Sequence, residues 1–488
     1  IGNKVGQGRV HIIEDVSKIG EFKKGEVLVT KMTDPDWVAA FSLASAIVTD
    51  EGGKTCFGGE TLLLTNKGFL KFSELYKEFK PNEFQILSFD VKNNKIVWRP
   101  IVKVFKRKSN IYKIAISPNF KSTTNQLEVT PDHSFLTLEK RKIIKKEISS
   151  IIFNKEGILT ATKIPRFSNH NFDPKESYLM GALLTDGCVL KNKQGGYVVS
   201  FSQKNTPEKL NFINTINSFF ETLYNKKFRM VFRKDRRKEL YFNCYSKDVY
   251  LRVNQFKENL LSNILSMDEE NLHMFLAGII DGDGNISDHQ IQITVGQEKL
   301  LQAIVIASLK LGINPSVCRD KNWWVVSFDK KFAPDLLKFT QRVNKNFSRS
   351  PQGHTKKFIS SQIIGDIIGL INQRGRMKHD YLGRQNMITD YKIRKSVLPK
   401  VGTKIKEELE KILEAPFSMQ RVKLLSKRKE KQNVYNLEVM ADDELDHNYI
   451  VFTKNYTPII VGNCHAAIVS RELGIPAIVG TQRATKIL

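Results

Sequence analysis

The spacing of apolar positions changes several times along the chain. Residues 8–55 alternate short apolar runs with turn residues, which predicts strands with a helix. From 56 to about 165 nearly every apolar run has the length of a strand, and "QILSFDVKNNKIVWRP" predicts a hairpin that turns at Asn93-Asn94. Helical periodicity alternates with strands from about 170 to 415, and short strands return over 419–463. Similar patterns thus enclose a different one, which predicts nested domains.

A repeat inside the helical region supports this nesting. The stretch "YLMGALLTDGCV" (178–189) recurs as "FLAGIIDGDGNI" (275–286), each on a predicted helix. Helix-start signals precede both copies: Asp173 with a following proline, and Ser266 with Glu269 in capping-box spacing. Both helices are predicted to end at an Asp-Gly pair, where glycine suits a left-handed stop.

The aspartates that end these helices, Asp186 and Asp283, are candidates for metal chemistry. A carboxylate at a helix C-terminus faces the negative end of the dipole, which costs about 0.3–1 kcal/mol. Gly181 and Gly278 predict close packing of the two helices, which would bring the carboxylates together. A divalent cation relieves their repulsion, and paired carboxylates holding Mg²⁺ indicate phosphodiester hydrolysis. The alternative is a buried packing repeat whose aspartates only cap the turns.

The charge of the chain is large and unevenly distributed. The length of 488 residues predicts three or four domains. The formal net charge of +26 predicts a polyanion partner. Residues 1–55 hold seven Lys/Arg and eight Asp/Glu, and residues 464–488 hold three and one, so 56–463 carry +25 of the total. A basic block between nearly neutral flanks indicates nucleic acid as the partner, with a merely solvated surface as the alternative.

Cysteine usage and hydropathy exclude other classes. The five cysteines are scattered without a C-x-x-C pair, which argues against a disulfide framework and a Cys-rich zinc site. No apolar run approaches 18 residues and no signal peptide opens the chain. We therefore expect a cytoplasmic protein with no membrane partner.

The internal repeat resembles the paired motifs of LAGLIDADG homing endonucleases. The second copy, "LAGIIDGDG" (276–284), matches closely, and "LMGALLTDG" (179–187) has Leu184 where the motif's first acidic residue stands. The resemblance implies an α/β domain over 166–417 with two pseudo-symmetric halves. It implies site-specific, Mg²⁺-dependent cleavage of double-stranded DNA, with Asp186 and Asp283 as metal ligands.

The same resemblance suggests further site residues. Lys247 in "CYSKD" and Lys330 in "VSFDKK" are candidates for the lysines that support the cleavage centres. In "SFSQKNTPEKL" (200–210) the candidates for DNA contact are Gln203 and Lys204. Additional phosphate contacts are expected from the run "RKDRRKE": Arg233, Lys234, Arg236, Arg237 and Lys238.

A second resemblance covers 408 of the 488 residues. "CFGGETLLLT" (56–65) is similar to the start of an intein and "VGNC" (461–464) to its end. "LEVTPDHSFLT" and "VYNLEVMADDELDHNYIV" are similar to the two internal splicing blocks. The resemblance implies an all-β Hint (hedgehog/intein) splicing domain formed by 56–165 and 418–463, with the endonuclease inserted into it.

The intein resemblance assigns the splicing chemistry to six residues: Cys56, Thr130, His133, His447, Asn463 and Cys464. Cys56 would attack the carbonyl carbon of the preceding residue and form a thioester, since a thiol is the least demanding side-chain nucleophile. Thr130 and His133 would assist that step. Cys464 would then take the acyl group, and Asn463 would close a succinimide to free the segment, assisted by His447. Splicing is expected to need no cofactor.

Departures from the family patterns leave alternatives open. Gly462 stands where histidine is usual before the terminal Asn, and Asn436 stands where an acidic residue is usual. One alternative is therefore a splicing-impaired scaffold that acts only as an endonuclease. The other, motivated by Leu184 and Thr185, is an active intein with a decayed nuclease.

Removing 56–463 joins "TDEGGKT" to "CHAAIVSRELGIPAIVGT". The joined 80 residues, from 1–55 and 464–488, resemble the swivelling β/β/α phosphohistidine domain of phosphoenolpyruvate synthase and its relatives. The resemblance implies that His465 carries the phosphoryl group when ATP, pyruvate and water yield phosphoenolpyruvate, AMP and phosphate. The partners would be the host enzyme's remaining domains, without which this fragment is expected to be inactive. The expected DNA target is the intein-free allele.

Overall fold

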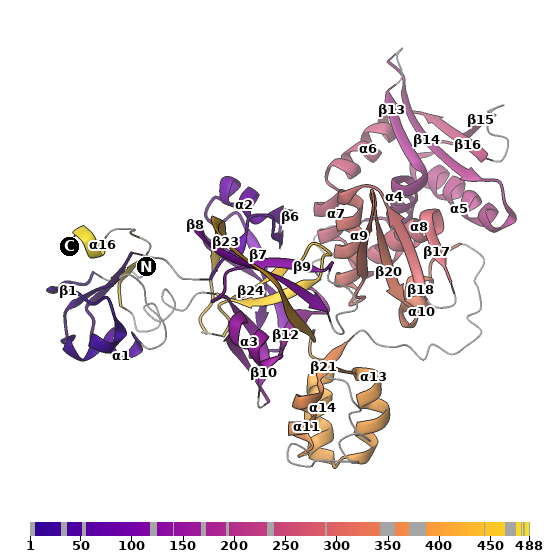
Figure 1. Ribbon diagram of the computed structural model, residues 1–488. Helices are drawn as coiled ribbons and strands as arrows, with labels where there is room; N and C mark the ends of the chain where they lie inside the picture. The colour runs from indigo at the N-terminus through magenta and orange to yellow at the C-terminus, as the bar shows by residue number, and fades with distance from the viewer. Residues whose placement is uncertain are drawn as a thin grey trace.

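The protein is described by a computed structural model. The described residues are 5–30, 37–50, 55–117, 124–139, 141–166, 172–191, 195–231, 239–287, 290–341, 357–369, 387–443, 445–463, 475–479, 481 and 484–487. They form several units that contain both sheets and helices (Figure 1).

The two ends of the chain build one small unit, at the left of Figure 1. Its sheet has the order β1 (Val10–Ile12), β2 (Val27–Thr30), β3 (Ala46–Thr49) and β26 (Ala477–Val479), all parallel. Helices α1 (Val38–Phe41) and α16 (Ala484–Ile487) accompany it. Because β26 pairs with β3, segments on either side of the long internal region complete each other.

The central sheet also combines two parts of the chain. Its strands are β4 (Phe57–Gly58), β5 (Leu62–Thr65), β6 (Gly68–Lys71), β7 (Gln85–Asp90), β8 (Lys95–Ser117), β9 (Gln126–Val129), β10 (Ser134–Glu139), β11 (Lys142–Glu147), β12 (Gly157–Ala161), β23 (Phe417–Val439), β24 (Asn448–Phe452) and β25 (Pro458–Gly462). The order is β11-β10-β25-β12-β23-β4-β9-β8-β7-β5-β24, and β24 pairs with β25 as well, which closes the sheet. Helices α2 (Phe72–Glu78) and α3 (Ile148–Asn154) pack on it.

The predicted hairpin at Asn93-Asn94 is confirmed. Strands β7 and β8 pair from Gln85 to Asp90, and Asn94 has φ 51°, a conformation that asparagine tolerates better than most residues. Strand β8 then continues along β23 with three register shifts, so these two strands of 23 residues form the long ribbon of the sheet.

Residues 172–341 form a unit of two similar halves, which we call the paired-helix unit. The first half contains α4 (Pro174–Asp186), β13 (Gly187–Lys191), β14 (Tyr197–Lys204), α5 (Pro207–Tyr224), β15 (Arg229–Val231), β16 (Glu239–Tyr245) and α6 (Lys247–Glu258). After α7 (Leu260–Ser266), the second half contains α8 (Glu269–Asp283), β17 (Gly284–Ile286), β18 (Gln290–Val295), α9 (Glu298–Lys310), β19 (Ser316–Asp320), β20 (Trp323–Asp329) and α10 (Ala333–Leu336). The sheets share one topology, β13-β14-β16-β15 and β17-β18-β20-β19.

The repeat helices α4 and α8 pack against each other through glycine, as the sequence predicted. A Cβ added at Gly181 would lie 2.2 Å from the backbone oxygen of Phe275, and one at Gly278 would lie 2.1 Å from that of Tyr178. No side chain fits at these distances, so the two backbones touch directly. This contact places the C-terminal ends of both helices at the same point of the unit.

Two details of the predicted helix ends are wrong. Helix α8 begins after Asp268, whose side chain accepts from the Asn271 backbone N–H, because Ser266 already belongs to α7. The glycines after the aspartates are extended rather than left-handed, since the chain enters a strand directly. Glycine is needed there for space: a Cβ at Gly187 would meet the Leu183 carbonyl oxygen at 2.5 Å.

Along the chain, a smaller unit follows the paired-helix unit and precedes β23. It contains β21 (Phe358–Ser360), α11 (Ser361–Ile367), β22 (Met387–Thr389), α13 (Asp390–Lys392) and α14 (Thr403–Glu414), drawn in orange in Figure 1. Strands β21 and β22 form a sheet of their own. In all the residues that the structure describes, no helix is both long and apolar enough to cross a membrane.

Candidate functional site

The two ends of the internal segment meet in the central sheet. Phe57 on β4 pairs with Val129 and Tyr435, and Val461 on β25 pairs with Phe135. We call the group that gathers there the junction site, made of Thr55, Cys56, Thr130, His133, Asn436, His447 and Asn463. All seven side chains are buried. The fold therefore brings together the described residues that the sequence assigned to one reaction.

Cys56 is held from both sides by Thr130. Its backbone N–H donates to the Thr130 Oγ1 at 2.9 Å, and its carbonyl accepts from the Thr130 N–H at 2.9 Å. The Cys56 Sγ accepts from Arg107 Nε at 3.3 Å. Arg107 carries no motif and lies in an alternating strand, so the sequence reasoning missed it.

His133 is a fully buried, neutral imidazole. Its ring centroid lies 4.1 Å from that of Phe57, and neither ring nitrogen has a hydrogen-bond partner among the described residues. Burial lowers the pKa of His133 to about 3. At neutral pH this imidazole is therefore uncharged, and taking a proton would create a buried charge.

The Asn436 amide connects both junctions. Its Nδ2 donates to the Thr55 Oγ1 at 3.3 Å and to the Asn463 Oδ1 at 3.5 Å. Its Oδ1 accepts from the Tyr449 hydroxyl at 2.5 Å and from the Leu437 N–H at 2.8 Å. Because two donors fix the oxygen, the amide nitrogen must face the junctions. An acidic side chain could not make these two donations.

His447 lies opposite Asn463 across the β24–β25 hairpin. The Asn463 backbone N–H donates to the His447 carbonyl at 2.8 Å. The residues on either side fix this loop: Asp446 forms an ion pair with Arg99 at 2.5 Å, and Asn448 Nδ2 donates to the Phe89 carbonyl at 2.7 Å. His447 is therefore carried on a loop tied to the body of the sheet.

The structure explains the glycine that precedes Asn463. A Cβ added at Gly462 would lie 3.2 Å from the Ser134 Cβ and 3.2 Å from the Lys145 Cδ. These distances are tighter than most Cβ contacts. The histidine that is usual at this position would have to displace both neighbours.

A second group lies at the C-terminal ends of α4 and α8. The Asp186 Oδ2 accepts from Gln203 Nε2 at 2.8 Å, and a Cβ built on Gly282 would lie 2.9 Å from the same oxygen. Asp186 therefore faces the end of α8, one residue before Asp283. Gln203 is buried and its amide holds the carboxylate, while its expected role as a base-contacting side chain stays a prediction.

Lys209 compensates the end of α8. Its buried ammonium donates to the carbonyls of Asp281 at 2.6 Å and Gly282 at 2.7 Å. A cation at a helix C-terminus offsets the dipole, which is the compensation that an aspartate at this end requires. The sequence signal was weak, since Lys209 is one lysine among many.

Leu184 stands where the repeat motif has an acidic residue, and the residues that differ between the two copies around this position are paired across the two helices. Asp281, fully buried in the second motif, accepts from the Tyr178 hydroxyl at 2.6 Å. Burial, and then the Asp281 charge, raise the pKa of Tyr178 far above its usual range. In the repeat Phe275 takes the place of Tyr178 and Leu184 the place of Asp281. Each of these pairs takes one residue from α4 and one from α8, so the polar pair Tyr178–Asp281 has the apolar pair Phe275 and Leu184 at the equivalent positions, which is a compensated exchange.

The two lysines proposed for the cleavage centres lie elsewhere. Register pairs Gly187, next to Asp186, with Phe201, whereas Lys247 follows the end of β16 where Tyr245 pairs with Val198. At about 3.3 Å per residue, Lys247 is roughly 10 Å or more away along the strands. Lys330 likewise follows the end of β20 opposite Gln290, away from Asp283. The structure brings neither lysine to the helix ends.

Other predicted residues are exposed or not described. Lys204 is exposed and pairs with Glu239 in the register of β14 and β16. Cys464 and His465 lie outside the described residues, as do the five basic residues Arg233, Lys234, Arg236, Arg237 and Lys238. Their roles stay predictions.

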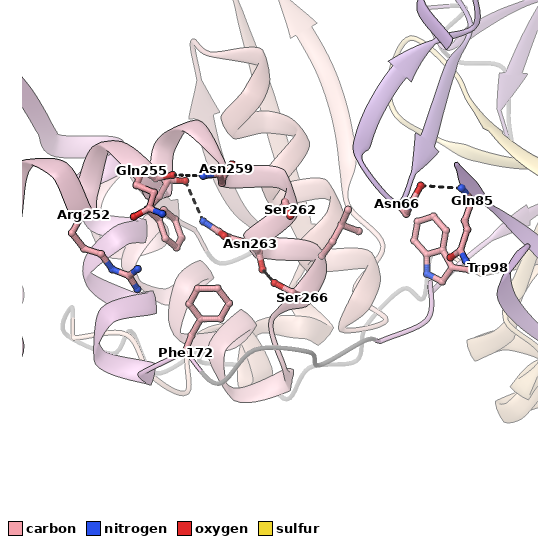
Figure 2. A pocket seen from close by; sticks show the side chains of 12 residues that line it. Asn66, Gln85, Trp98, Phe172, Arg252, Gln255, Asn259, Ser262, Asn263 and Ser266 are labelled. Atoms are coloured by element: carbon pink, nitrogen blue, oxygen red, sulfur yellow. Dashed lines mark hydrogen bonds between the residues drawn. The ribbon is translucent and has the colours of Figure 1, made fainter. Parts of the chain in front are cut away.

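A polar cleft separates the paired-helix unit from the central sheet. Figure 2 shows amide side chains of α6 and α7, such as Gln255 and Asn263, across from Trp98 and Gln85. The cavity has a volume of about 510 Å³. It is lined neither by a residue of the junction site nor by Asp186 or Asp283, so it belongs to neither candidate centre.

Family comparisons agree with this division. Residues 22–58 and 462–488 match the family described as PEP-utilising enzyme, mobile domain, and residues 259–327 match the homing endonuclease family. The flanks thus match an interrupted PEP-utilising mobile domain, and part of the region between them matches a homing endonuclease domain. The resemblances to LAGLIDADG homing endonucleases and to the mobile domain of phosphoenolpyruvate synthase are thereby confirmed, and the arrangement is consistent with an intein inserted in a phosphoenolpyruvate synthase.

Relatives of this interrupted domain are phosphoenolpyruvate synthases. A probable phosphoenolpyruvate synthase of Methanocaldococcus jannaschii is 32% identical over 500 residues, which cover 99% of this chain and 41% of the relative. The Neisseria meningitidis phosphoenolpyruvate synthase is 57% identical over 56 residues, 12% of this chain and 7% of the relative. The chain thus spans about two fifths of the first relative.

Similar solved structures are homing endonucleases and a LAGLIDADG domain. Mesophilic variants of the homing endonuclease I-DmoI are 19% identical, cover 35% of this chain and 98% of their own, and have a TM-score of 0.30. The N-terminal LAGLIDADG domain of DUF199/WhiA is 15% identical, covers 37% and 90%, and has a TM-score of 0.27.

Proposed function

We propose that residues 56–463 excise themselves from this chain and join Thr55 to Cys464. The observation that carries the proposal is the Asn436 amide, which donates to Thr55 and to Asn463 at the same time. A reaction that breaks the bonds after Thr55 and after Asn463 and then joins the flanks needs both junctions in one site. Flanks that belong to one domain on either side of the segment support the same proposal.

The junction site offers residues for the first and the last cleavage, and Cys464, which lies outside the described residues, is proposed for the transfer between them. Cys56, fixed by Thr130, attacks the carbonyl carbon of Thr55 and breaks the Thr55–Cys56 peptide bond. Cys464 takes the acyl group from the thioester. Asn463, whose side-chain oxygen is held by Asn436, then closes a succinimide and releases the segment. Finally the acyl group moves from the Cys464 sulfur to the Cys464 nitrogen that the cyclisation has freed, which breaks the thioester, returns the thiol and forms the Thr55–Cys464 peptide bond. The residues of the chain supply every reacting group.

We further propose that the paired-helix unit cleaves double-stranded DNA with Mg²⁺. In the described residues no group of three or more His, Cys, Asp or Glu side chains is placed to hold a metal ion. The pair Asp186 and Asp283 fits a hard cation that takes its other ligands from DNA phosphate and water. When bound, the ion would stabilise charge on the phosphate; Gln203 orients the Asp186 carboxylate and Lys209 steadies the end of α8.

The host activity follows the relatives. The spliced flanks would form the mobile domain of a cytoplasmic phosphoenolpyruvate synthase, with His465 as the phosphoryl carrier and the enzyme's other domains as partners. Two alternatives are each motivated by particular residues. Gly462 and Asn436 motivate impaired splicing, and Leu184 motivates a decayed nuclease. The fit of Asn436 to both junctions and the Tyr178–Asp281 exchange favour the active forms.

Two assays test the proposal. Intact mass spectrometry of the expressed chain at neutral pH under reducing conditions should show a 408-residue and an 80-residue species, absent from a Cys56→Ala, Asn463→Ala control. DNA carrying the joined Thr55–Cys464 codons should be cut in Mg²⁺ and left intact by Asp186→Asn, Asp283→Asn. An unchanged 488-residue mass would refute splicing, and uncut DNA would refute the nuclease.

A further inference from the structure

Arg107 lies on the more buried side of its strand. Along β8 its neighbours Lys106 and Lys108 are exposed, as expected for lysines on a solvent-facing side, whereas Arg107 is half-buried. Side chains alternate along a strand, so Arg107 points to the opposite side from these lysines. There its Nε donates to the Cys56 Sγ at 3.3 Å.

The surroundings hold this contact in place. Arg107 pairs with Val434 in the register of β8 and β23, and Val434 packs with Cys56 and Ile111 in one small buried cluster. Thr130 fixes the backbone of Cys56 on both sides. The sulfur and the guanidinium are therefore positioned by two separate parts of the sheet.

We propose that Arg107 is a catalytic residue of the first splicing step, in which its guanidinium stabilises the Cys56 thiolate. The assignment rests on the proposed splicing function and adds a cation to it. The thiolate is the nucleophile, and a buried thiol in apolar surroundings is otherwise hard to ionise. Cys56 is only 2% exposed, so water cannot supply the stabilisation that Arg107 gives.

Among the described residues, the other groups near Cys56 do not supply that positive charge. Thr130 is uncharged, and His133 is neutral because burial lowers its pKa to about 3. Glu128 on β9 lies near Gly58, where a Cβ would be 2.9 Å from its Oε2, and its negative charge opposes a thiolate. The Arg428 guanidinium forms an ion pair with Glu128 at 3.2 Å and offsets this repulsion.

The step balances without a co-reactant. Cys56 loses its thiol proton, and its sulfur forms a bond to the carbonyl carbon of Thr55. The Thr55–Cys56 carbon–nitrogen bond then breaks, and the released Cys56 nitrogen takes up one proton. A proton has moved from sulfur to nitrogen and no oxidation has occurred.

The test measures the thiolate itself. In full-length chains that carry Asn463→Ala and Cys464→Ala, the ultraviolet absorbance of thiolate is titrated against pH. Subtracting the same titration of a further Cys56→Ser variant isolates Cys56. With Arg107→Gln we expect the midpoint to rise by about one pH unit, a tenfold loss of thiolate at lower pH, and with Arg107→Lys by less. Thiol-induced cleavage after Thr55 should shift to higher pH in parallel.

The matched control is Lys108→Gln, which removes one positive charge from the next position of the same strand. Its midpoint should move by less than a third of the Arg107→Gln shift. Equal shifts in the two variants, or an unmoved midpoint in Arg107→Gln with intact circular dichroism, would overturn the role of Arg107. If no variant cleaves after Thr55, the splicing proposal fails, while the titration still decides whether Arg107 stabilises the thiolate.

Discussion

Replacing Gly278 by alanine should separate α4 from α8. The added Cβ would lie 2.1 Å from the Tyr178 carbonyl oxygen, and ordinary contact begins near 3.4 Å, so the helices must move apart by more than 1 Å. The atom in the way belongs to a helix backbone and cannot rotate aside. Overpacking of this kind costs about 3 kcal/mol, and the better helix propensity of alanine returns about 1 kcal/mol. We therefore expect a net loss of about 2 kcal/mol.

Hydrogen exchange read by mass spectrometry measures this loss locally, which a chain of several units requires. A loss of about 2 kcal/mol corresponds to roughly thirtyfold faster exchange in peptides from α4 and α8. Gly181→Ala should give the same effect, because its Cβ would lie 2.2 Å from the Phe275 oxygen. Gly296→Ala is the matched control, since nothing lies within 4 Å of its added Cβ. Exchange in α4 and α8 that changes less than threefold in Gly278→Ala would refute the close packing.

Three further changes test other contacts. Because burial lowers the pKa of His133 to about 3 from an unfolded value of 6.5, the unfolded chain binds more protons between these values, so stability falls as pH falls through that window. Between pH 7 and 5 the free energy of unfolding of the central sheet, measured in urea, should fall by about 2 kcal/mol, and His133→Phe should remove this fall. The same pH dependence in His133→Phe as in the unsubstituted chain would contradict the burial. Asn436→Ala should slow both junction reactions about tenfold in timed mass spectrometry, since it removes hydrogen bonds to Thr55 and Asn463; loss at one junction alone would contradict the shared amide. Gln203→Ala should slow cleavage of one DNA strand about 10- to 100-fold and leave nicked product, and equal slowing of both strands would contradict its role at Asp186 alone.

Patterns that repeat or that need a special residue were predictable from the sequence. The recurrence of the glycine-containing helices indicated α4 and α8, because only glycine allows backbones to touch. The asparagine pair at 93–94 indicated the hairpin, because few residues accept a positive φ. The return of short strands over 419–463 indicated nested domains, and the structure pairs β23, β24 and β25 with strands of the first segment in one sheet.

Contacts made across the fold were not predictable. Arg107 reaches Cys56 only because a strand of 23 residues carries it past β4, and nothing in its local sequence shows this. Lys247 and Lys330 were chosen because they follow strands, but strand register decides which end of a sheet a residue occupies, and both lie at the far ends. Gln203 was expected at the DNA because the resemblance puts the end of its strand there, and the sequence did not show that its amide also reaches Asp186.

One peptide tests whether the two junctions react as a pair. Trypsin cleaves after Lys54 and after Arg471, so a joined product yields Thr-Cys-His-Ala-Ala-Ile-Val-Ser-Arg, in which Thr55 is bonded directly to Cys464. Tandem mass spectrometry of the purified chain after incubation at neutral pH should detect this peptide, and should not detect it in Cys56→Ala, Asn463→Ala. Its absence, with the peptide that begins Thr55-Cys56-Phe57 still present in full, would show that the junction site does not splice.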